Sequence, residues 1–436
     1  MTLSGKHLAI LGAGRSGRAA AALALREGAC VSVWDTAGME AFAAMPAAAA
    51  QHPHATAEDG RAVVCDLLVV SPGIDSYGPY VAAFAAQAGE VIGEVELAAR
   101  YYAGRIIAIT GTNGKTTTTE LVERILARAG LGGAACGNYG VPFAEIVLQD
   151  PPPAAVALEL SSFQLETIRT LHPVVAIWLN FAPDHMDRYP TVAAYRAAKL
   201  RVFKNQTAAD TAVVRAGEEL PPLAARVATF STIDQSADWY SNGHTIHHGG
   251  DMVLDLTQNT GLRGLHNAEN AMAAMAACRA LDIPFALMAA ALHGYAPPAH
   301  RCELIRTLDG VEYLNDSKAT NLHALESALR SQTRPVVLLA GGKDKGLDYS
   351  PVLPLLRTKA VACVTFGQIA GPLAELFAPA VTSQAVATLA QAVAAARLLA
   401  PRGSSILLSP GTSSFDQFSG YEQRGDAFRN LVHQLR

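Results

Sequence analysis

A short apolar run that leads into a glycine-rich turn and a lysine constrains the fold of this 436-residue chain more than any other feature. The run Ile106–Ile109 is typical of a buried strand, and the stretch GTNGKTT at Gly111–Thr117 follows it directly. A helix is predicted from Lys115 to about Ala129. Strand, glycine-rich loop and helix in this order indicate a phosphate cradle, because glycines let backbone N–H groups and the helix N-terminus face phosphate oxygens.

Two side chains extend the chemistry of this cradle. Lys115 supplies a positive charge, and the Thr116 hydroxyl can ligate Mg²⁺. The common form of the motif has glycine where Ile109 stands, so the loop here, whose first glycine is Gly111, is shorter. The alternative is a glycine-rich turn with a lysine nearby by chance. A motor, a kinase, a transporter subunit and a ligase all need such a loop, so the motif alone leaves the reaction open.

Strand-like runs alternate with helical stretches in three blocks of the chain. Outside the cradle, we expect strands at His7–Leu11, Cys30–Trp34, Leu67–Val70, Val156–Leu160, Val174–Leu179, Val336–Ala340, Val361–Phe366 and Ile406–Ser409. Such alternation is typical of α/β domains with mainly parallel sheets. We therefore predict an α/β protein with a Rossmann-like domain at residues 1–93 and a central P-loop ATPase-like parallel sheet at 94–298. A C-terminal Rossmann-like domain follows at 299–436, after a linker at Pro297-Pro298.

Composition and charge argue against several classes of protein. The formal net charge of −4 provides no basic field for nucleic acid. No apolar segment approaches the roughly 20 residues needed to cross a bilayer. The six cysteines include no Cys-x-x-Cys pair, which argues against a disulfide framework or a zinc site. We therefore expect a cytoplasmic enzyme that neither binds nucleic acid nor inserts into a membrane. We also expect it to be a monomer.

Polar residues stand where strands of the central block are predicted to end. Ligands of parallel sheets gather at the carboxyl ends of the strands. Glu159 stands at the end of one predicted strand, and Asp184-His185 follows another. Carboxylate and imidazole groups near phosphates favour a second metal ion. The alternatives are an exposed strand-end glutamate and a solvated loop histidine.

The first block carries the pattern Gly12-x-Gly14-x-x-Gly17, with Asp35 at the end of the next strand. This pattern taken alone suggests NAD, with the acidic residue on a ribose hydroxyl. It shows only that backbone and helix dipole face a diphosphate, and UDP also carries one. A tight turn without a ligand is the alternative.

Four polar stretches of the third block also lie near predicted strand ends. They read HRCE, which contains His300 and Arg301; NDSKATN, which begins at Asn315; GGKDKG, which contains Lys345; and SPGTSSFDQF, which contains Ser414. So many polar residues exceed what a solvated surface needs. We expect them to form a binding site.

These motifs together resemble those of the Mur ligases, in the same order and over essentially the whole chain. GTNGKTTT and the HN..N pattern of His266, Asn267 and Asn270 are shared by the wider family. The stretches ELSSFQLE, DHMDRYP, YRAAKLR, NDSKATN and LSPGTSSFDQF are specific to its D-glutamate-adding branch. The resemblance implies an ATP- and Mg²⁺-dependent ligase that joins D-glutamate to UDP-N-acetylmuramoyl-L-alanine through an acyl phosphate.

The resemblance also assigns roles to residues of this chain. The ATP-binding set is Gly111, Thr112, Asn113, Gly114, Lys115, Thr116, Thr117, Asn267, Asn270, Arg301 and Asp316. The UDP-substrate set is Gly14, Asp35, Thr36, Ser71, Gly73, Asn138 and Ser161. The glutamate set is Thr320, Lys345, Ser414 and Tyr421. The metal ligands are Thr116, Glu159, His185 and Lys199, and the catalytic set is Lys115, Glu159, His185, Lys199 and Lys318.

Lys199 is expected to be carbamylated. It stands in the helical stretch AAYRAAKLRVF, where Tyr195, Val202 and Phe203 are three or four residues away and share its side of a helix. Their bulk desolvates the amine and lowers its pKa, and only a neutral amine reacts with CO₂. The resemblance implies the same modification, and an ordinary surface lysine is the alternative.

Three other functions compete with this interpretation. A sibling ligase that uses L-glutamate or another amino acid would have nearly the same motifs, because these specify the reaction better than the stereochemistry. An NAD-dependent dehydrogenase is suggested only by the Gly12–Gly17 pattern and Asp35. A P-loop motor or switch would have no need of the polar cluster in the third block.

Overall fold

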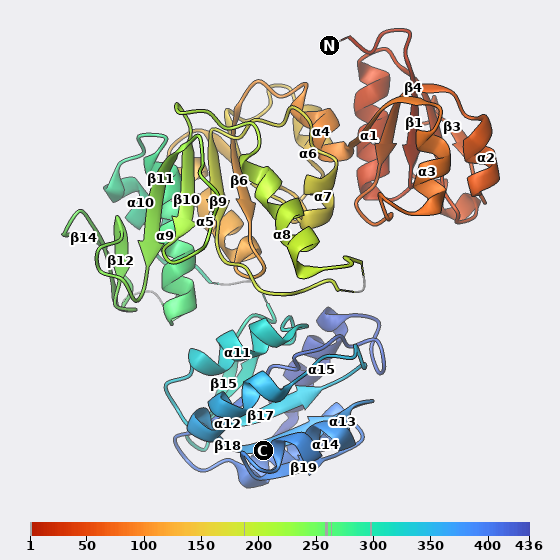
Figure 1. Ribbon diagram of the computed structural model, residues 1–436. Helices are drawn as coiled ribbons and strands as arrows, with labels where there is room; N and C mark the ends of the chain where they lie inside the picture. Colours follow the sequence, from red (N-terminus) through yellow and green to blue (C-terminus); the bar gives the residue numbers. More distant parts are fainter. Residues whose placement is uncertain (1, 187, 258–259, 263, 297–298) are drawn as a thin grey trace. The chain divides into compact units, whose positions relative to one another are not determined.

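Three β-sheets organise the chain in the computed structural model, which describes residues 2–186, 188–257, 260–262, 264–296 and 299–436 (Figure 1). The expected linker at Pro297-Pro298 lies outside the described residues. The contacts between residues divide the chain into two compact units. The first unit comprises Met1–Asn259 and Asn267–Gly294, and the second comprises Thr260–His266 and Tyr295–Arg436. The first two predicted domains thus belong to one unit, and the boundaries predicted for the three domains stay predictions.

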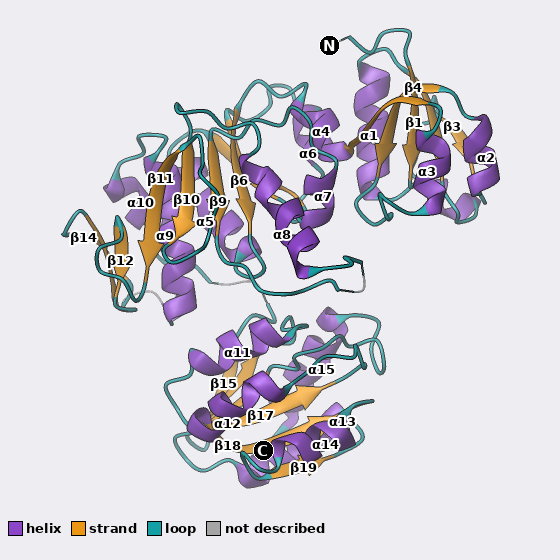
Figure 2. Cartoon of the chain, in the orientation of Figure 1, coloured by secondary structure: helices purple, strands orange, loops and turns teal. Residues whose placement is uncertain are grey.

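The first sheet has five parallel strands in the order β3-β2-β1-β4-β5. Its strands are β1 (His7–Leu11), β2 (Cys30–Trp34), β3 (Ala50–His52), β4 (Cys65–Val70) and β5 (Ala88–Gly93). Its helices are α1 (Arg15–Arg26), η1 (Met39–Phe42), α2 (Ala57–Ala62) and α3 (Pro79–Ala85). The side chains of Leu8 and Ile10 join the core on the α1 face, and those of Ala9 and Leu11 join the core that holds Phe84 of α3. Helices therefore cover both faces of this sheet, as the alternation of elements in Figure 2 also shows.

The central sheet has nine strands in the order β14-β13-β12-β11-β10-β9-β6-β8-β7. Its strands are β6 (Arg105–Thr110), β7 (Gly132–Gly137), β8 (Ala155–Glu159), β9 (Val175–Trp178), β10 (Thr211–Arg215), β11 (Arg226–Ser231), β12 (Trp239–Ser241), β13 (Thr245–His248) and β14 (Asp251–Asp255). Strands β6 to β12 pair in parallel with their neighbours, whereas β12, β13 and β14 form an antiparallel edge. The accompanying helices are α4 (Glu94–Ala99), α5 (Lys115–Arg128), α6 (Phe143–Val147), α7 (Ser162–Glu166), α8 (Val192–Leu200), η2 (Arg201–Phe203), α9 (Leu265–Arg279) and α10 (Phe285–Leu292).

The second unit is built on a sheet of six strands in the order β15-β16-β20-β17-β18-β19. The strands are β15 (Glu303–Leu308), β16 (Val311–Asn315), β17 (Val336–Gly341), β18 (Ala360–Phe366), β19 (Ser383–Ala385) and β20 (Ser405–Leu408). Only β15 and β16 pair antiparallel within the described sheet. The helices are η3 (Thr260–Leu262), α11 (Leu322–Arg330), η4 (Ser350–Val352), α12 (Leu353–Lys359), α13 (Ala370–Phe377), α14 (Leu389–Leu399) and α15 (Tyr421–Gln434).

The prediction of an α/β fold with mainly parallel sheets is confirmed, and each expected strand is present within about two residues of its predicted ends. One local expectation is wrong. The α-helix that carries Lys199 ends at Leu200, so Val202 and Phe203 lie in the following 3₁₀ turn rather than on the face of the same α-helix. Among the described residues, no helix has both the length and the apolar character needed to cross a bilayer.

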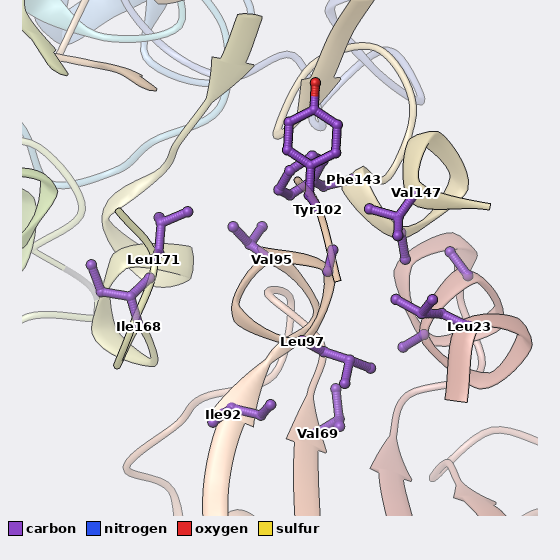
Figure 3. Close-up of a cluster of buried hydrophobic side chains, with 14 of the residues drawn as sticks. Leu23, Val69, Ile92, Val95, Leu97, Tyr102, Phe143, Val147, Ile168 and Leu171 are labelled. Atoms are coloured by element: carbon purple, nitrogen blue, oxygen red, sulfur yellow. The ribbon is translucent and has the colours of Figure 1, made fainter. Parts of the chain in front are cut away.

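Apolar side chains join the first sheet to the central one inside the first unit. Figure 3 shows Leu23 of α1, Leu97 of α4 and Val147 of α6 in one buried cluster. The Arg26 guanidinium adds a hydrogen bond to the Val147 carbonyl at 2.8 Å. Apolar contacts and this hydrogen bond therefore pack α1 against α6.

Candidate functional site

The glycine-rich loop lies between β6 and α5, where the sequence predicts a phosphate cradle. Gly114 precedes α5 with a φ of 84°, in the left-handed region that favours glycine. A Cβ atom at this position would lie 2.3 Å from the Asn270 Oδ1 atom. Glycine is therefore required both by the backbone conformation and by the approach of α9.

Asn180, which follows β9, braces this loop from the neighbouring strand. Its Oδ1 accepts the Asn113 N–H at 2.9 Å, and its Nδ2 donates to the Asn113 carbonyl at 3.1 Å. The Asn180 carbonyl also accepts the Thr112 N–H at 3.0 Å. No role was expected for Asn180 from the sequence, although its place after a strand beside the cradle is a signal that could have found it.

Most of the residues expected to bind ATP in the first unit come together at this loop. The Lys115 ammonium donates to the carbonyls of Gly111 and Thr112, each at 3.0 Å. Thr116 and Thr117 are buried in the first turn of α5. On α9, Asn270 Nδ2 donates to Asn267 Oδ1 at 3.4 Å, and Asn270 Oδ1 accepts a hydrogen bond from the Thr118 hydroxyl at 3.4 Å. The structure thus unites two motifs that are about 150 residues apart in the chain.

Glu159 ends β8 as a buried carboxylate. Its Oε1 accepts a hydrogen bond from the Asn138 side-chain amide at 2.7 Å, and the Asn138 backbone N–H donates to the Glu159 carbonyl at 2.9 Å. The Oε2 atom is buried and has no hydrogen-bond partner among the described residues. A buried carboxylate oxygen without a partner is costly, so this one is suited to a cation or a donor group of a ligand.

Lys199 is a fully buried lysine, with 2% of its surface exposed. Its Nζ donates to the Gly111 carbonyl at 2.8 Å and lies 5.0 Å from the centre of the Tyr195 ring. Burial lowers the pKa of the Lys199 amine well below its ordinary value, and repulsion from Lys115 lowers it further. Glu159 and Asp184 oppose that shift, so both lie within electrostatic reach of the amine.

His185 occupies a different environment from Lys199. Its φ is 58°, and its side chain is 45% exposed. The ring packs edge-on against Phe163 and Tyr195, with centroid distances of 5.0 and 5.9 Å. Tyr195 therefore contacts the ring of His185 and also the amine of Lys199, which lies over the Tyr195 ring.

The donor set near the cradle depends on the chemical state of Lys199. Among the residues that the structure describes, no three His, Cys, Asp or Glu side chains form a group that could hold a metal ion. The unpartnered Glu159 oxygen suits a cation, whereas a protonated lysine repels one. A neutral Lys199 that has reacted with CO₂ would supply the missing oxygen ligands, so the residues fit Mg²⁺ only in that form.

In the first sheet, Asp35 braces the glycine-rich turn. Its Oδ2 accepts the Ala13 N–H at 2.6 Å, and its Oδ1 accepts the Ala37 N–H at 2.8 Å. A Cβ atom on Gly17 would lie 1.8 Å from the Gly12 carbonyl oxygen, so glycine permits the close packing of this turn. Gly14 caps α1 without a side-chain hydrogen bond, which leaves that helix N-terminus to a ligand.

A crevice between the first and central sheets contains one of the residues expected to bind the UDP substrate, Ser71. It is lined by Val70, Ser71, Pro72, Ser76, Gly93, Glu94, Val95, Phe163, Gln164 and Thr167. Ser161, at the adjoining end of α7, forms a capping box with Gln164. Gly73 and Thr36 belong to loops that follow β4 and β2, on the same edge of the first sheet.

Arg188 ties the loop after β4 to the central sheet, a role that sequence reasoning missed. Its guanidinium donates to the Pro72 and Ile74 carbonyls at 3.4 and 3.3 Å. It also pairs with Glu166 at 3.0 Å and lies over the Phe163 ring at 3.9 Å. Its position in the DHMDRYP motif was visible, but nothing in the motif indicates which loop it reaches.

In the second unit, Arg301 stands between two residues with left-handed backbone. His300 has a φ of 67° and Cys302 a φ of 45°, and neither is glycine. Such strain concentrates at binding sites. The Arg301 Nε atom is buried and has no partner among the described residues. Nearby Asp316 accepts the Cys302 N–H at 3.2 Å, and burial raises the Asp316 pKa to about 7.

The residues expected to bind glutamate come from three loops of the second unit and from the first residue of α15, Tyr421. Lys345 Nζ donates to the Thr320 carbonyl at 3.2 Å, and Lys318 Nζ lies 5.2 Å from the centre of the Tyr421 ring. Ser414 is buried in the loop after β20, where the neighbouring Ser413 carbonyl accepts the Lys343 N–H at 3.0 Å. The three loops therefore meet, and cationic side chains from two of them are suited to a carboxylate ligand.

The chain is similar in sequence to known proteins over its whole length. Residues 109–278 match the Mur ligase middle domain, and residues 300–411 match the Mur ligase glutamate ligase domain. The UDP-N-acetylmuramoylalanine–D-glutamate ligase of Myxococcus xanthus is 41% identical over 100% of both chains. The enzyme of that name from Geobacter metallireducens is 37% identical over 100% of this chain and 99% of its own.

Solved structures show the same fold at lower identity. A pseudomurein peptide ligase of Methanothermus fervidus has a TM-score of 0.63 and 15% identity, covering 99% of this chain and 100% of its own. A UDP-N-acetylmuramate–alanine ligase of Thermotoga maritima has a TM-score of 0.60 and 18% identity, covering 98% of this chain and 99% of its own. Both support a three-domain α/β architecture.

Proposed function

The chain belongs to the Mur ligase family, and we propose that it joins D-glutamate to UDP-N-acetylmuramoyl-L-alanine in peptidoglycan precursor synthesis, with ATP cleaved to ADP and phosphate. The observation that carries this proposal is similarity over the full length to ligases of that name. It is supported by a cradle for phosphate beside a buried carboxylate and a buried lysine.

The chemistry explains why such a ligase needs a phosphate loop. A free carboxylate is a poor electrophile toward an amine, because an oxide ion would have to leave. Transfer of the γ-phosphoryl group of ATP to the alanine carboxylate gives an acyl phosphate and ADP. The glutamate amine then attacks the carbonyl carbon, and the tetrahedral intermediate loses phosphate and a proton to give the amide.

Residues of the cradle stabilise the charge that moves in this transfer. The N–H groups of the loop and of the first turn of α5 would face the phosphates of ATP, and Lys115, which donates to the loop carbonyls in the structure, would pair with phosphate oxygens. Asn267, Asn270, Arg301 and Asp316 complete the proposed nucleotide contacts. The half-buried side chains of Lys318 and Tyr421 lie where the amino acid is proposed to bind.

Mg²⁺ would be held by Thr116, Glu159, His185 and carbamylated Lys199, and it would neutralise phosphate charge when bound. Gly14, Asp35, Thr36, Ser71, Gly73, Asn138 and Ser161 are proposed to hold the UDP-sugar. Thr320, Lys345, Ser414 and Tyr421 are proposed to hold D-glutamate. We assign these tasks to residues 1–93, 94–298 and 299–436 as three domains of a monomer that works in the cytoplasm.

The test is the substrate dependence of ADP release by the purified chain. We expect ADP only when UDP-N-acetylmuramoyl-L-alanine and D-glutamate are both present, with L-glutamate inactive. The Lys115→Ala variant tests the phosphate loop. It should lose at least about a hundredfold in rate, because no other charge of the loop replaces the lysine. ADP release that ignores the UDP-sugar would contradict the proposal, and preference for L-glutamate or another amino acid would favour a sibling ligase.

A further inference from the structure

Arg424, the fourth residue of α15, is fully buried, with 0% of its surface exposed. All of its hydrogen bonds go to uncharged oxygens. The Nε atom donates to Ser317 Oγ at 3.0 Å, and Nη2 donates to the Ser317 carbonyl at 2.8 Å. Both Nη atoms donate to the Thr412 carbonyl at 3.2 Å.

The charge of this guanidinium has no close counter-ion. Burial lowers the Arg424 pKa to about 10, which still leaves it protonated at neutral pH. Asp416, Asp316 and Tyr349 raise its pKa electrostatically. Among the described residues, however, no carboxylate forms an ion pair with it. A buried charge is costly unless it is paired, so a neutral side chain of similar size would suit a purely structural role better.

The guanidinium lies where three loops meet. Ser317 belongs to the loop after β16, and Thr412 belongs to the loop after β20. The third loop follows β17, where a Cβ atom on Gly342 would lie 3.2 Å from Arg424 Nη1. These are the loops that carry Thr320, Ser414 and Lys345.

Further hydrogen bonds connect the partners of Arg424 to one another. The Ser317 hydroxyl donates to the Tyr421 carbonyl at 2.9 Å. The Thr412 hydroxyl donates to the Lys343 carbonyl at 2.6 Å. A displacement of Arg424 would therefore be transmitted to every loop that is proposed to touch the amino acid.

We propose that Arg424 is a positioning residue that holds these three loops in the arrangement needed to bind a dicarboxylate amino acid. This inference rests on the proposed function of the same site. The planar fork of the arginine is needed because it bonds two loops at once, which a lysine cannot do. Its uncompensated charge also favours the extra negative charge of a dicarboxylate over a neutral amino acid.

The experiment compares Michaelis constants for D-glutamate and ATP in the full chain. Arg424→Lys keeps the charge and removes the fork, Arg424→Met removes both, and Ser317→Ala removes one hydroxyl of the network. Arg429→Met is the matched control, because Arg429 is on the same helix but pairs with Glu303 at 2.8 Å and away from the three loops. We expect both Arg424 variants to raise the KM for D-glutamate at least about tenfold, since small displacements of binding groups have large effects.

The KM for ATP should stay within about twofold in these variants, and Ser317→Ala should raise the KM for D-glutamate by a smaller factor. An unchanged KM for D-glutamate, or equal increases in the KM values for ATP and D-glutamate, would overturn the inference while leaving the proposed function intact. A wild-type chain that does not consume D-glutamate would instead overturn the proposed function. If Arg424→Met fails to fold, Arg424→Lys and Ser317→Ala decide the result.

Discussion

At the scale of single residues, the buried amine of Lys199 makes a sharp chemical prediction. Its pKa is lowered by burial and by Lys115, which favours the neutral form that reacts with CO₂. We expect Lys199→Ala to lose at least about a hundredfold in activity, because a metal ligand and its charge are removed. Acetate or formate should restore part of this activity by occupying the space of the carbamate.

Lys204→Ala is the control for this experiment, because Lys204 is an exposed lysine five residues later. It should behave like the wild type and gain nothing from acetate. Carbon NMR after exposure to labelled CO₂ provides a second readout, with a carbamate signal expected in the wild type and absent from Lys199→Ala. Full activity in Lys199→Ala would rule out the carbamate.

Glu94 gives a residue-scale prediction about pH. Its carboxylate is 2% exposed, accepts the Ala144 N–H at 2.6 Å, and has an Oε2 atom without a partner among the described residues. Burial raises its pKa to about 7 from 4.5. A folded-state pKa above the unfolded value stabilises the fold fully below about pH 4.5 and loses that contribution as the pH rises through about 7.

Glu94→Gln mimics the protonated form, so its stability relative to wild type should rise from pH 5 to pH 8. The gain should be at most about 3 kcal/mol, from 1.36 kcal/mol for each pKa unit. Urea unfolding at the two pH values measures it. Glu123→Gln is the control, because Glu123 also accepts a backbone N–H, from Ala135 at 2.8 Å, but is only half-buried. Equal effects of pH on both variants would contradict the prediction.

At the scale of elements, the sequence predicted strands and glycine-rich turns well and the braces between loops poorly. The cradle follows from Ile106–Ile109 and its glycines, because period and backbone conformation are local properties. Asn180, Arg188 and Arg424 act instead through side-chain bonds to distant backbone atoms. No local pattern marks such a bond, since its partner is fixed only when the sheet order brings two loops together.

Asn180 shows what such a brace contributes to an element. It bonds both the N–H and the carbonyl of Asn113, so its removal takes away two bonds that order the middle of the phosphate loop. Asn180→Ala should raise the KM for ATP about tenfold or more and leave that for D-glutamate nearly unchanged, because loop order is a condition for phosphate binding. Steady-state kinetics with each substrate varied in turn measures the difference.

Asn205→Ala is the matched control for Asn180→Ala. Asn205 also makes two side-chain bonds to backbone, to the carbonyls of Arg169 and Leu171 at 2.9 and 2.8 Å, but does not touch the loop. It should lower stability without changing the KM for ATP. If the order of the loop depended only on its glycines, both variants would have the same KM for ATP, and the prediction would be contradicted.

At the scale of the whole molecule, the joint inside the first unit couples two sheets that belong to separate predicted domains. The apolar core runs without a break from Leu23 of α1 to Val147 of α6, and Leu97 between them is fully buried (Figure 3). Interfaces between domains of one chain are usually more polar and allow motion. An apolar joint of this kind should make the first and central sheets unfold as one cooperative unit.

Leu68→Ala tests this cooperativity from a position away from the joint. Leu68 is fully buried on β4, in the core that faces α3. The substitution should cost about 2–5 kcal/mol through lost burial and the cavity that remains. Hydrogen exchange in increasing urea, read separately on peptides of β1 and β6, should show both midpoints falling by the same amount. Leu338→Ala on β17 of the second unit is the control and should leave both midpoints unchanged. If Leu68→Ala lowers the β1 midpoint and spares β6, the joint does not couple the two sheets, and the first sheet unfolds as an independent domain.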